Sequence, residues 1–406
     1  MDEYCRLGEV VTIQRGTTYK SALLGRPGPV LLGLGSIQKH GGFRGEKLKT
    51  YGGESPDNLL VHPGEVYASL KDVTQTADLL GSVAMVPKGS LVGRLTQDTV
   101  RLCVIDSRFS VDYVHWMLRT PEYREHCRGH ATGTTTMGLA RDDFFAFKIP
   151  IPTRSTVALI ELLVALDAKI GANERSSQLA LELADAMFLS AERNSTTRHT
   201  IGELAERSIL EYGDGYRTKR LEHGQPGLRI LRAGDVRGLQ CFADGDDFVS
   251  KGYIKQIGAK RSQTGDVVMT TKGTVGRVAV VSKTLEPVVY SPQVCYFRVK
   301  DEAELHPAYL AAWFRSADRK AQSEMVMYKS DMAPYINLND IRSLRIPILA
   351  RSEMHRAGTE QRALLDQFDA SCAENAVLAR TRDELLPRLM SGEIKIKDAE
   401  TAADVV

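Results

Sequence analysis

The chain has 406 residues, of which 43% are hydrophobic and 26% charged, and its formal net charge is +2 at pH 7. This is the composition of a globular protein with room for two or three domains. Its apolar runs are too short to span a membrane, and its first residues lack the pattern of an export signal. The six scattered cysteines contain no C-x-x-C pair, so we expect a reduced, cytoplasmic protein.

The second half of the chain repeats the first at an offset of roughly 200 residues. Three short Gly-containing segments return in the same order: 7–10 at 201–204, 63–66 at 264–267, and 81–86 at 276–281. Each half then has an aromatic, helix-like stretch and closes on an apolar tail with proline: 113–124 and 147–152 in the first half, 309–319 and 344–349 in the second. The preserved order predicts an internal duplication.

The globular part of each half has the pattern of short strands. Apolar or β-branched runs bounded by Gly, Pro and Asp predict strands at 83–86, 100–105, 267–271 and 278–281. One or two helices lie among these strands in each half. The sequence therefore predicts an α+β fold class, with two related mixed α/β domains.

A long helix is predicted after each tail, over 155–193 and 352–391, because both segments are rich in Ala, Leu, Glu and Arg. Steps of three and four give an apolar row in each helix with one polar interruption, Asn173 or Asn375. The rows begin with Leu163, Leu166, Ile170 and Asn173 in the first helix, and with Leu365, Phe368, Cys372 and Asn375 in the second.

The matched rows favour two antiparallel coiled-coil helices packed on each other, in which the two asparagines meet and form a hydrogen bond. The alternative is that each helix simply lies on its own globular domain.

In its order of parts, the chain resembles the specificity (S) subunit of type I restriction-modification systems. The resemblance rests on the tails 149–152 and 346–348, each of which leads into a long helix. It rests also on Glu360-Gln361-Arg362, on Gly273-Thr274-Val275-Gly276-Arg277, and on the segment 389–394. The first helix has no Glu-Gln at its start, and Leu349 replaces the second proline.

The resemblance implies five parts: a target-recognition domain (1–152), a central helix (153–195), a second recognition domain (196–349), a distal helix (350–394) and a tail (395–406). It also implies partners, namely double-stranded DNA, two adenine methyltransferase subunits and, in a full restriction complex, ATP-dependent translocase-nuclease subunits. This chain would bind no cofactor; S-adenosylmethionine, ATP and Mg would belong to the partners.

The sequence predicts no catalysis and no metal site. An Asn/Asp-Pro-Pro-aromatic loop, which such a methyltransferase uses to hold its target base, is absent. Gly33-Leu34-Gly35 lacks the third glycine of a dinucleotide loop, so a strand end or a turn is expected there. The segment 272–276 lacks the Gly-Lys-Ser/Thr of a P-loop, so a turn is expected. His126, Cys127 and His130 lack a fourth ligand at zinc spacing, which favours a packing or surface role.

DNA recognition needs cations for phosphates and planar donors for base edges. The candidate DNA-binding residues in the first half are Arg15, Lys20, Lys39, Arg44 and Lys71. Those in the second half are Arg217, Lys219, Arg220, Lys251, Lys255, Lys260, Arg261, Lys272 and Arg277. Because the two halves have diverged, the sequence predicts a bipartite, asymmetric DNA target.

Two other functions remain open. One is a coiled-coil assembly scaffold that binds no DNA, and the other is a specificity subunit of a system that only methylates. Salt-dependent DNA binding distinguishes the first, and a nuclease subunit encoded nearby distinguishes the second.

Overall fold

The computed structural model describes residues 3–45, 48–74, 76–89, 92–195, 197–327 and 334–388. The end of the predicted distal helix (389–394), the predicted tail (395–406) and residue 196 lie outside them. The chain forms two compact units, 1–170 with 377–406 and 171–376. In the part that the structure describes, no helix is both long and apolar enough to cross a bilayer.

The first unit is built on a four-stranded antiparallel sheet. Its order is β2 (Val11–Arg15), β9 (Thr99–Val104), β5 (Val66–Ser69) and β7 (Val83–Met85). A second sheet has the order β3 (Val30–Leu32), β8 (Gly93–Leu95) and β4 (Leu60–Val61), and a third has β10 (Ala131–Thr132), β11 (Met137–Leu139) and β6 (Lys71–Asp72). The helices are α1 (Leu7–Val10), α2 (Val111–Met117), α3 (Pro121–Gly129) and α4 (Arg141–Ala146), and β1 (Tyr4–Arg6) pairs with β12 (Lys148–Pro150).

The second unit repeats this plan. Its four-stranded sheet has the order β14 (Leu210–Asp214), β22 (Val294–Val299), β19 (Val267–Thr270) and β20 (Val278–Val280). Smaller sheets are β18 (Phe248–Ser250), β15 (Gly227–Leu231) and β21 (Val288–Tyr290), then β16 (Val236–Arg237) with β17 (Gln240–Cys241), and β13 (Thr197–Thr200) with β23 (Arg345–Ile348). The helices are α6 (Ile201–Glu206), α7 (Ile254–Ile257), α8 (Pro307–Arg315), α9 (Ala317–Met327) and α10 (Leu338–Ser343).

The duplication extends to details of pairing. The only parallel strand pair of each unit among the described strands occupies the same place, β3 with β8 and β15 with β21. A buried tyrosine at the start of each aromatic helix donates to a carbonyl oxygen of the closing tail: Tyr113 to Pro150 at 3.0 Å and Tyr309 to Pro347 at 3.1 Å. The predicted pair of related mixed α/β domains is therefore confirmed.

Each aromatic stretch expected to be one helix consists of two. In the first unit α2 ends at Met117, and Pro121 begins α3, since proline at the first helical position needs no hydrogen-bond partner. In the second unit Ser316 separates α8 from α9, and its hydroxyl accepts from the backbone N–H of Arg319 at 3.2 Å. These breaks follow from local capping chemistry rather than from the apolar periodicity.

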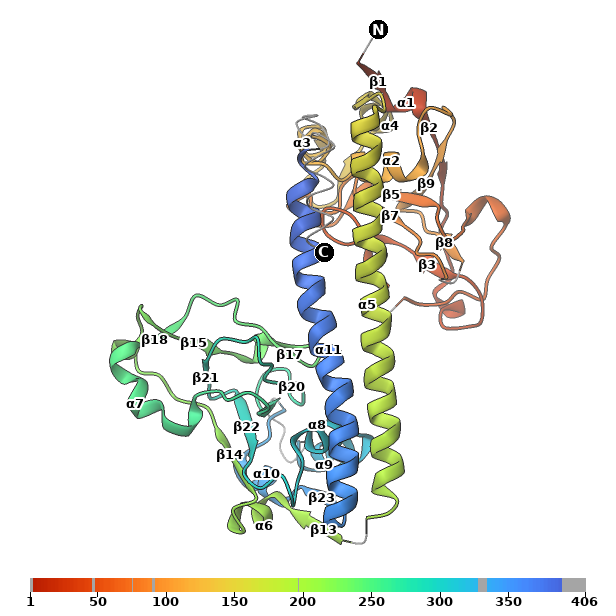
Figure 1. The fold of residues 1–406 in the computed structure, drawn as a ribbon. Coiled ribbons are helices and arrows are strands. Elements are labelled where there is room, and N and C mark those ends of the chain that lie inside the picture. The colour runs from red at the N-terminus through yellow and green to blue at the C-terminus, as the bar shows by residue number, and fades with distance from the viewer. Residues whose placement is uncertain are drawn as a thin grey trace. The chain divides into compact units, whose positions relative to one another are not determined.

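The two long helices are α5 (Arg154–Glu192) and α11 (Arg351–Leu385), within about one residue of both predicted starts (Figure 1). In each unit the halves of the helices run antiparallel. Asp167 of α5 meets Arg382 of α11 at 2.8 Å in the first unit, and Ser176 of α5 meets Gln367 of α11 at 2.9 Å in the second.

The apolar rows of the helices contact the other helix and the domains together. Leu163 and Leu166 share one core with Leu378 and with the domain residue Tyr113. Leu365 and Phe368 share another with Phe188 and Tyr309. The two packing arrangements left open by the sequence therefore occur at once.

The two asparagines meet as predicted. The side chain of Asn173, which is 8% exposed, donates to Oδ1 of Asn375 at 2.9 Å. The same amide nitrogen also lies 2.6 Å from Oε2 of Glu374, a contact that the sequence did not suggest. A buried amide that satisfies two acceptors at once fixes which turns of the two helices face each other.

We expect Asn173→Leu to lower the free energy of unfolding by about 1–3 kcal/mol, because acceptors on the opposite helix lose a buried donor. Replacing both Asn173 and Asn375 by leucine should recover much of this loss, because the polar pair is removed together. Chemical denaturation of the two variants and the wild type measures the coupling. A single variant as stable as the wild type would contradict the role of the pair.

Candidate nucleic-acid interface

The second unit carries a small lobe, defined here by β15, β18, β21, the segment 251–261 with α7, and the loop 215–226 (Figure 1). Its own small core consists of Ile230, Val249, Ile257 and Val289, with Tyr216 packed against it. The loop is fixed to the strands by backbone contacts, among them a hydrogen bond from the N–H of Lys251 to the carbonyl of Pro226 at 2.9 Å.

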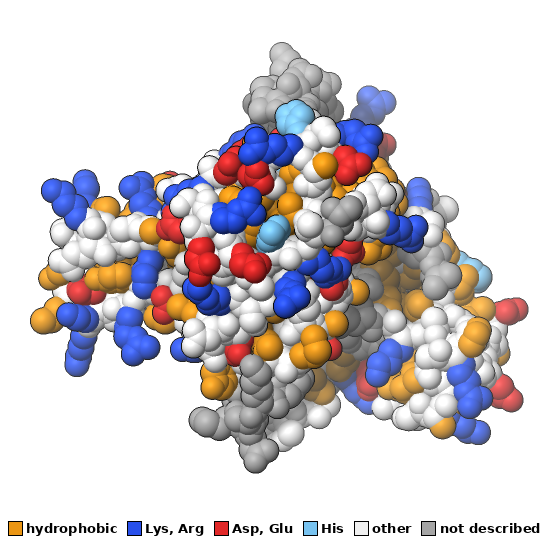
Figure 2. Space-filling view, turned by 90° about the horizontal axis from the view of Figure 1, so that it is seen from below, with side chains coloured by type: hydrophobic (Ala, Val, Ile, Leu, Met, Phe, Trp, Pro, Cys, Tyr) orange, Lys and Arg blue, Asp and Glu red, His pale blue; other side chains and the backbone are white. Residues whose placement is uncertain are grey.

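Lys and Arg side chains gather on this lobe, as Figure 2 shows on the part that projects to the left. Six of the predicted DNA-binding residues lie on it with exposed side chains and no ion pair to any residue that the structure describes. They are Arg217, Lys219, Arg220, Lys251, Lys255 and Arg261. Exposed cations without carboxylate partners are available for phosphates.

Lys260 has a different position from its neighbours. Its ammonium group donates to Oδ1 of Asp214 at 3.1 Å and to the carbonyl of Gly215 at 3.0 Å. This contact ties α7 and the residues after it to the end of β14. The structure therefore gives Lys260 a positioning contact, which weakens its case as a phosphate ligand.

Lys272 and Arg277 lie on the exposed turn that joins β19 to β20. Gly273 and Gly276 adopt φ values of +76° and +85°, which side chains with a Cβ rarely adopt, so the glycines allow the turn. The hydroxyl of Thr270 accepts from the backbone N–H of Arg277 at 3.0 Å. The expected turn at 272–276 is present.

In the first unit, Arg15, Lys20 and Arg44 are exposed and have no ion pair among the described residues. Lys39 pairs with Asp78 at 2.8 Å and Lys71 with Asp98 at 3.1 Å. The hydrogen bond from Lys39 lowers the pKa of Asp78. Both pairs are solvent-exposed on the lysine side, where an ion pair contributes little and a phosphate can compete for the ammonium group.

Four of the predicted cations are equivalent across the duplication. Lys20 follows the last residue of β2 by five positions, and Lys219 follows the last residue of β14 by five. Likewise, Lys71 and Lys272 each follow the end of β5 or β19 by two positions. Matched cations on domains that otherwise differ suit contacts with the phosphate backbone, which is the same at both half-sites.

Sequence reasoning missed a threonine-rich hairpin loop in the first unit. Thr132 at the end of β10 and Thr134, Thr135 and Thr136 in the loop before β11 are all exposed. Strand β11 pairs with β6, with Gly138 opposite Lys71. Hydroxyl groups can bond to phosphates or to either kind of base edge, and the run of threonines was the signal that could have identified them.

His126 and His130, which were considered as metal ligands, contact each other and the backbone. Their rings are 4.3 Å apart, and Nε2 of His126 lies 2.8 Å from the carbonyl of Asp143. Burial raises the pKa of the Cys127 thiol to about 11. Among the residues that the structure describes, no three His, Cys, Asp or Glu side chains could hold one metal ion.

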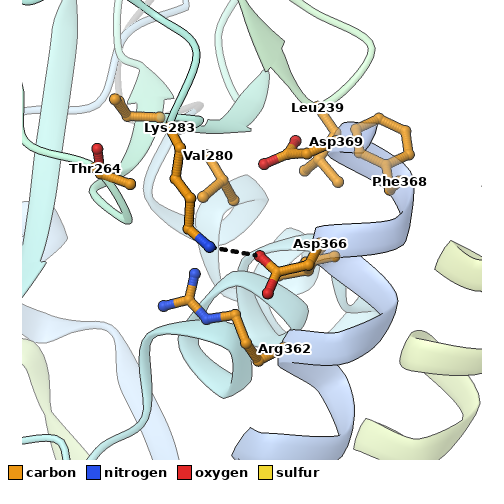
Figure 3. Close-up of a pocket in the computed structure, with 10 residues that line it drawn as sticks. Leu239, Thr264, Val280, Lys283, Arg362, Asp366, Phe368 and Asp369 are labelled. Carbon is orange, nitrogen blue, oxygen red and sulfur yellow. Dashed lines mark ion pairs between the residues drawn. The ribbon is translucent and has the colours of Figure 1, made fainter. Parts of the chain in front are cut away.

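A polar cluster joins the second domain to its half of α11 (Figure 3). Nζ of Lys283 lies 3.6 Å from Oδ1 of Asp366, and Asp369 lies one turn further along the helix beside Leu239. The enclosed space is about 10 Å³, enough for at most one water molecule. Burial, followed by the charge of Asp366, raises the pKa of Asp369 to about 6.

This raised pKa has a predictable effect on stability. The folded state favours the protonated carboxyl, so stability should fall as the pH rises from about 4, the unfolded value, to about 6. We expect Asp369→Asn to stabilise the protein by about 1 kcal/mol at pH 7, after allowance for partial exposure, and to have no effect at pH 4. Thermal melts at both pH values test this. Asp366→Asn is the comparison: it relieves part of the repulsion on Asp369 but also removes the ion pair with Lys283, so it should stabilise less than Asp369→Asn.

Comparisons with known proteins agree with this geometry. Residues 200–376 match the family described as "Type I restriction modification DNA specificity domain". No curated protein sequence matches the chain. The type I restriction-modification S subunit from M. genitalium is similar in structure, with a TM-score of 0.62 and 14% identity over 95% of each chain. The HsdS subunit from Thermoanaerobacter tengcongensis aligns over 96% of this chain and 97% of its own, with 16% identity and a TM-score of 0.33.

Two copies of one mixed α/β domain, each packed on the halves of two long helices, make up the specificity-subunit fold. Over residues 200–376, a little under half of its length, the chain is similar to this family of DNA specificity domains. The resemblance inferred from the sequence is confirmed. DNA target recognition is the role that defines this family.

Proposed function

We propose that this chain is the non-catalytic specificity subunit of a type I restriction-modification complex. The observation that carries the proposal is the duplicated domain with equivalent exposed lysines, in a chain whose second half matches the DNA specificity domain. Each domain reads one half-site, and the pair of domains reads a bipartite DNA target.

The matched lysines, Lys20 with Lys219 and Lys71 with Lys272, hold the phosphate backbone and set the orientation of each domain. The residues that differ between the domains read the bases. Arg217 and Arg220 in the second unit have no charged counterpart at positions matched by the strand ends, and the threonine loop 132–136 belongs to the first unit. The two half-sites therefore differ in sequence, and the composite target is asymmetric.

The partners are two adenine methyltransferase subunits, which bring S-adenosylmethionine, and the ATP-dependent translocase-nuclease subunits of a restriction complex. This chain selects the DNA sequence and positions the partner subunits on it, while the partners carry out every covalent step. No residue of the chain is assigned a catalytic role.

We expect the purified chain to transfer no methyl group from S-adenosylmethionine and to cut no DNA. Adding the methyltransferase subunits should produce adenine methylation at one bipartite sequence. Radiolabelled methyl transfer with and without these subunits is the measurement. Methylation by the chain alone would overturn the assignment.

Mapping methylated adenines in host DNA, with and without the gene for this chain, identifies the target. Loss of one bipartite motif is the expected result. An unchanged map together with the absence of salt-dependent DNA binding would favour the assembly scaffold instead.

A further inference from the structure

Leu221 stands out among the apolar side chains of the second unit. It is 88% exposed, more than any other exposed large hydrophobic residue in the described part of the chain, and the next is Met325 at 74%. In that part of the chain, no other exposed large hydrophobic side chain lies between Leu189 and Met325. Leu221 is thus the one exposed large hydrophobic side chain in this stretch of the described sequence.

The turn that carries Leu221 is firmly held. Residues Arg220–Glu222 form one turn of 3₁₀ helix, and the carboxylate of Glu222 accepts from the backbone N–H of Lys219 at 2.9 Å. Glu222 is only 5% exposed, and it also takes part in a hydrogen bond with Tyr216. Because Glu222 is buried and holds the turn, the adjacent Leu221 is directed to the surface by a fixed backbone conformation.

The surroundings of Leu221 are cationic. Arg217, Lys219 and Arg220 precede it, and all three are exposed without an ion pair among the described residues. Lys251 and Lys255 lie on the same lobe, since β18 pairs with the loop through His223 and Val249. A surface of this kind repels cationic protein surfaces but fits the negatively charged walls of a DNA groove.

We propose that Leu221 contacts the C5-methyl group of a thymine in the major groove of the half-site read by the second domain. The thymine methyl is the one apolar group on the major-groove base edges, and apolar side chains recognise it by contact. Lys219 reaches a phosphate at the edge of the groove, while Leu221, with Arg217 and Arg220 beside it, reaches the base edges on the floor. This inference rests on the proposed function.

The alternative position is the minor groove, where apolar wedges enter between base pairs. That groove is about 6 Å wide against about 12 Å for the major groove. The turn Arg220–Glu222 and the residues just before it, Arg217 and Lys219, bring three long cationic side chains beside the leucine, and this group is too broad for the minor groove. The major groove is therefore the better fit.

The duplication supplies a natural comparison. Seven positions after the end of β2 stands Ala22, in the short helix Ser21–Leu23, and seven after the end of β14 stands Leu221. The first domain folds with alanine at this place in the same kind of turn. Leu221→Ala should therefore fold, and it removes only the apolar contact.

The experiment uses the full chain, alone and in the complex it forms with methyltransferase subunits, and DNA that contains its target. Each dT of the two half-sites is replaced in turn by dU, which removes only the methyl group. The wild type should lose about fourfold in affinity at one dT, the value of one buried methyl group. Leu221→Ala should bind the dT and dU forms equally, and Leu221→Met should keep the preference for dT.

Three results would overturn the inference: a second half-site with no dT, a wild type indifferent to every dU, or a Leu221→Ala variant that is equally weakened on all sequences. The last would indicate a wedge or a general contact. Leu183→Ala, an exposed leucine of α5, is the control and should leave the dT preference unchanged. If the wild type shows no sequence preference at all, the proposed function has failed as well.

Discussion

Replacing Lys219, Lys251, Lys255 and Arg261 by glutamine should reduce the slope of log affinity against log salt concentration by up to about 3.6. Each phosphate contact contributes a slope of about 0.9, because one contact releases condensed counterions from the DNA. At physiological salt the affinity should fall by about two to three orders of magnitude. Titrations of a target duplex at several salt concentrations measure both quantities.

The lobe offers a matched control for this variant. Arg232 and Arg237 are also exposed cations of the second unit, but they pair with Asp247 and Asp244. Lys260 pairs with Asp214. Replacing these three by glutamine removes charges that are already balanced, so the slope should change much less. If this triple variant and the quadruple variant reduced the slope equally, the total charge of the protein, and not this surface, would govern binding.

The sequence predicted the architecture because its signals are local and repeated. Short Gly-containing turns, the proline tails and two long uninterrupted helical segments can be recognised without knowledge of tertiary contacts. The contact of Asn173 with Asn375 followed from heptad counting alone. Heptad counting did not predict that each apolar row contacts both the other helix and a domain, because the pattern of the row is the same whichever of these it faces.

The far half of α11 shows this limit. Continuing the predicted row beyond Asn375 by steps of three and four leads to Ala379 and Arg382, but the buried apolar residues there are Leu378 and Leu385. Arg382 instead pairs with Asp167 of α5 at 2.8 Å. The first domain packs on this part of the helix, and its core covers the neighbouring row of leucines.

The sequence predicted which cations belong to the candidate site but not how they are arranged or paired. Lys39, Lys71 and Lys260 have carboxylate partners that are 39, 27 and 46 positions away in the chain, which no local pattern indicates. The equivalence of Lys20 with Lys219 became visible only when the strand ends fixed the register of the two domains. Exposure of Leu221 is likewise a property of the folded turn.

Inserting one heptad into each long helix, after Asn173 in α5 and before Asn375 in α11, should move the two recognised half-sites apart by up to roughly three base pairs. Seven residues lengthen a helix by about 10 Å, and DNA rises about 3.4 Å per base pair. Both helices continue from one unit into the other, so a longer pair lengthens the connection between the domains. Mapping methylation by the reconstituted complex measures the spacing.

The position of the insertions is set by the antiparallel pairing. Residues after Asn173 face residues before Asn375, as the contact of Ser176 with Gln367 shows, so the inserted heptads lie opposite each other and the apolar rows stay in register. A heptad in α5 alone is the control, because it leaves seven residues without a partner and should abolish activity. The half-site sequences themselves should not change, since no cation or loop of either domain is altered. A functional double-insertion variant that keeps the original spacing would mean that the helices do not set the distance between half-sites.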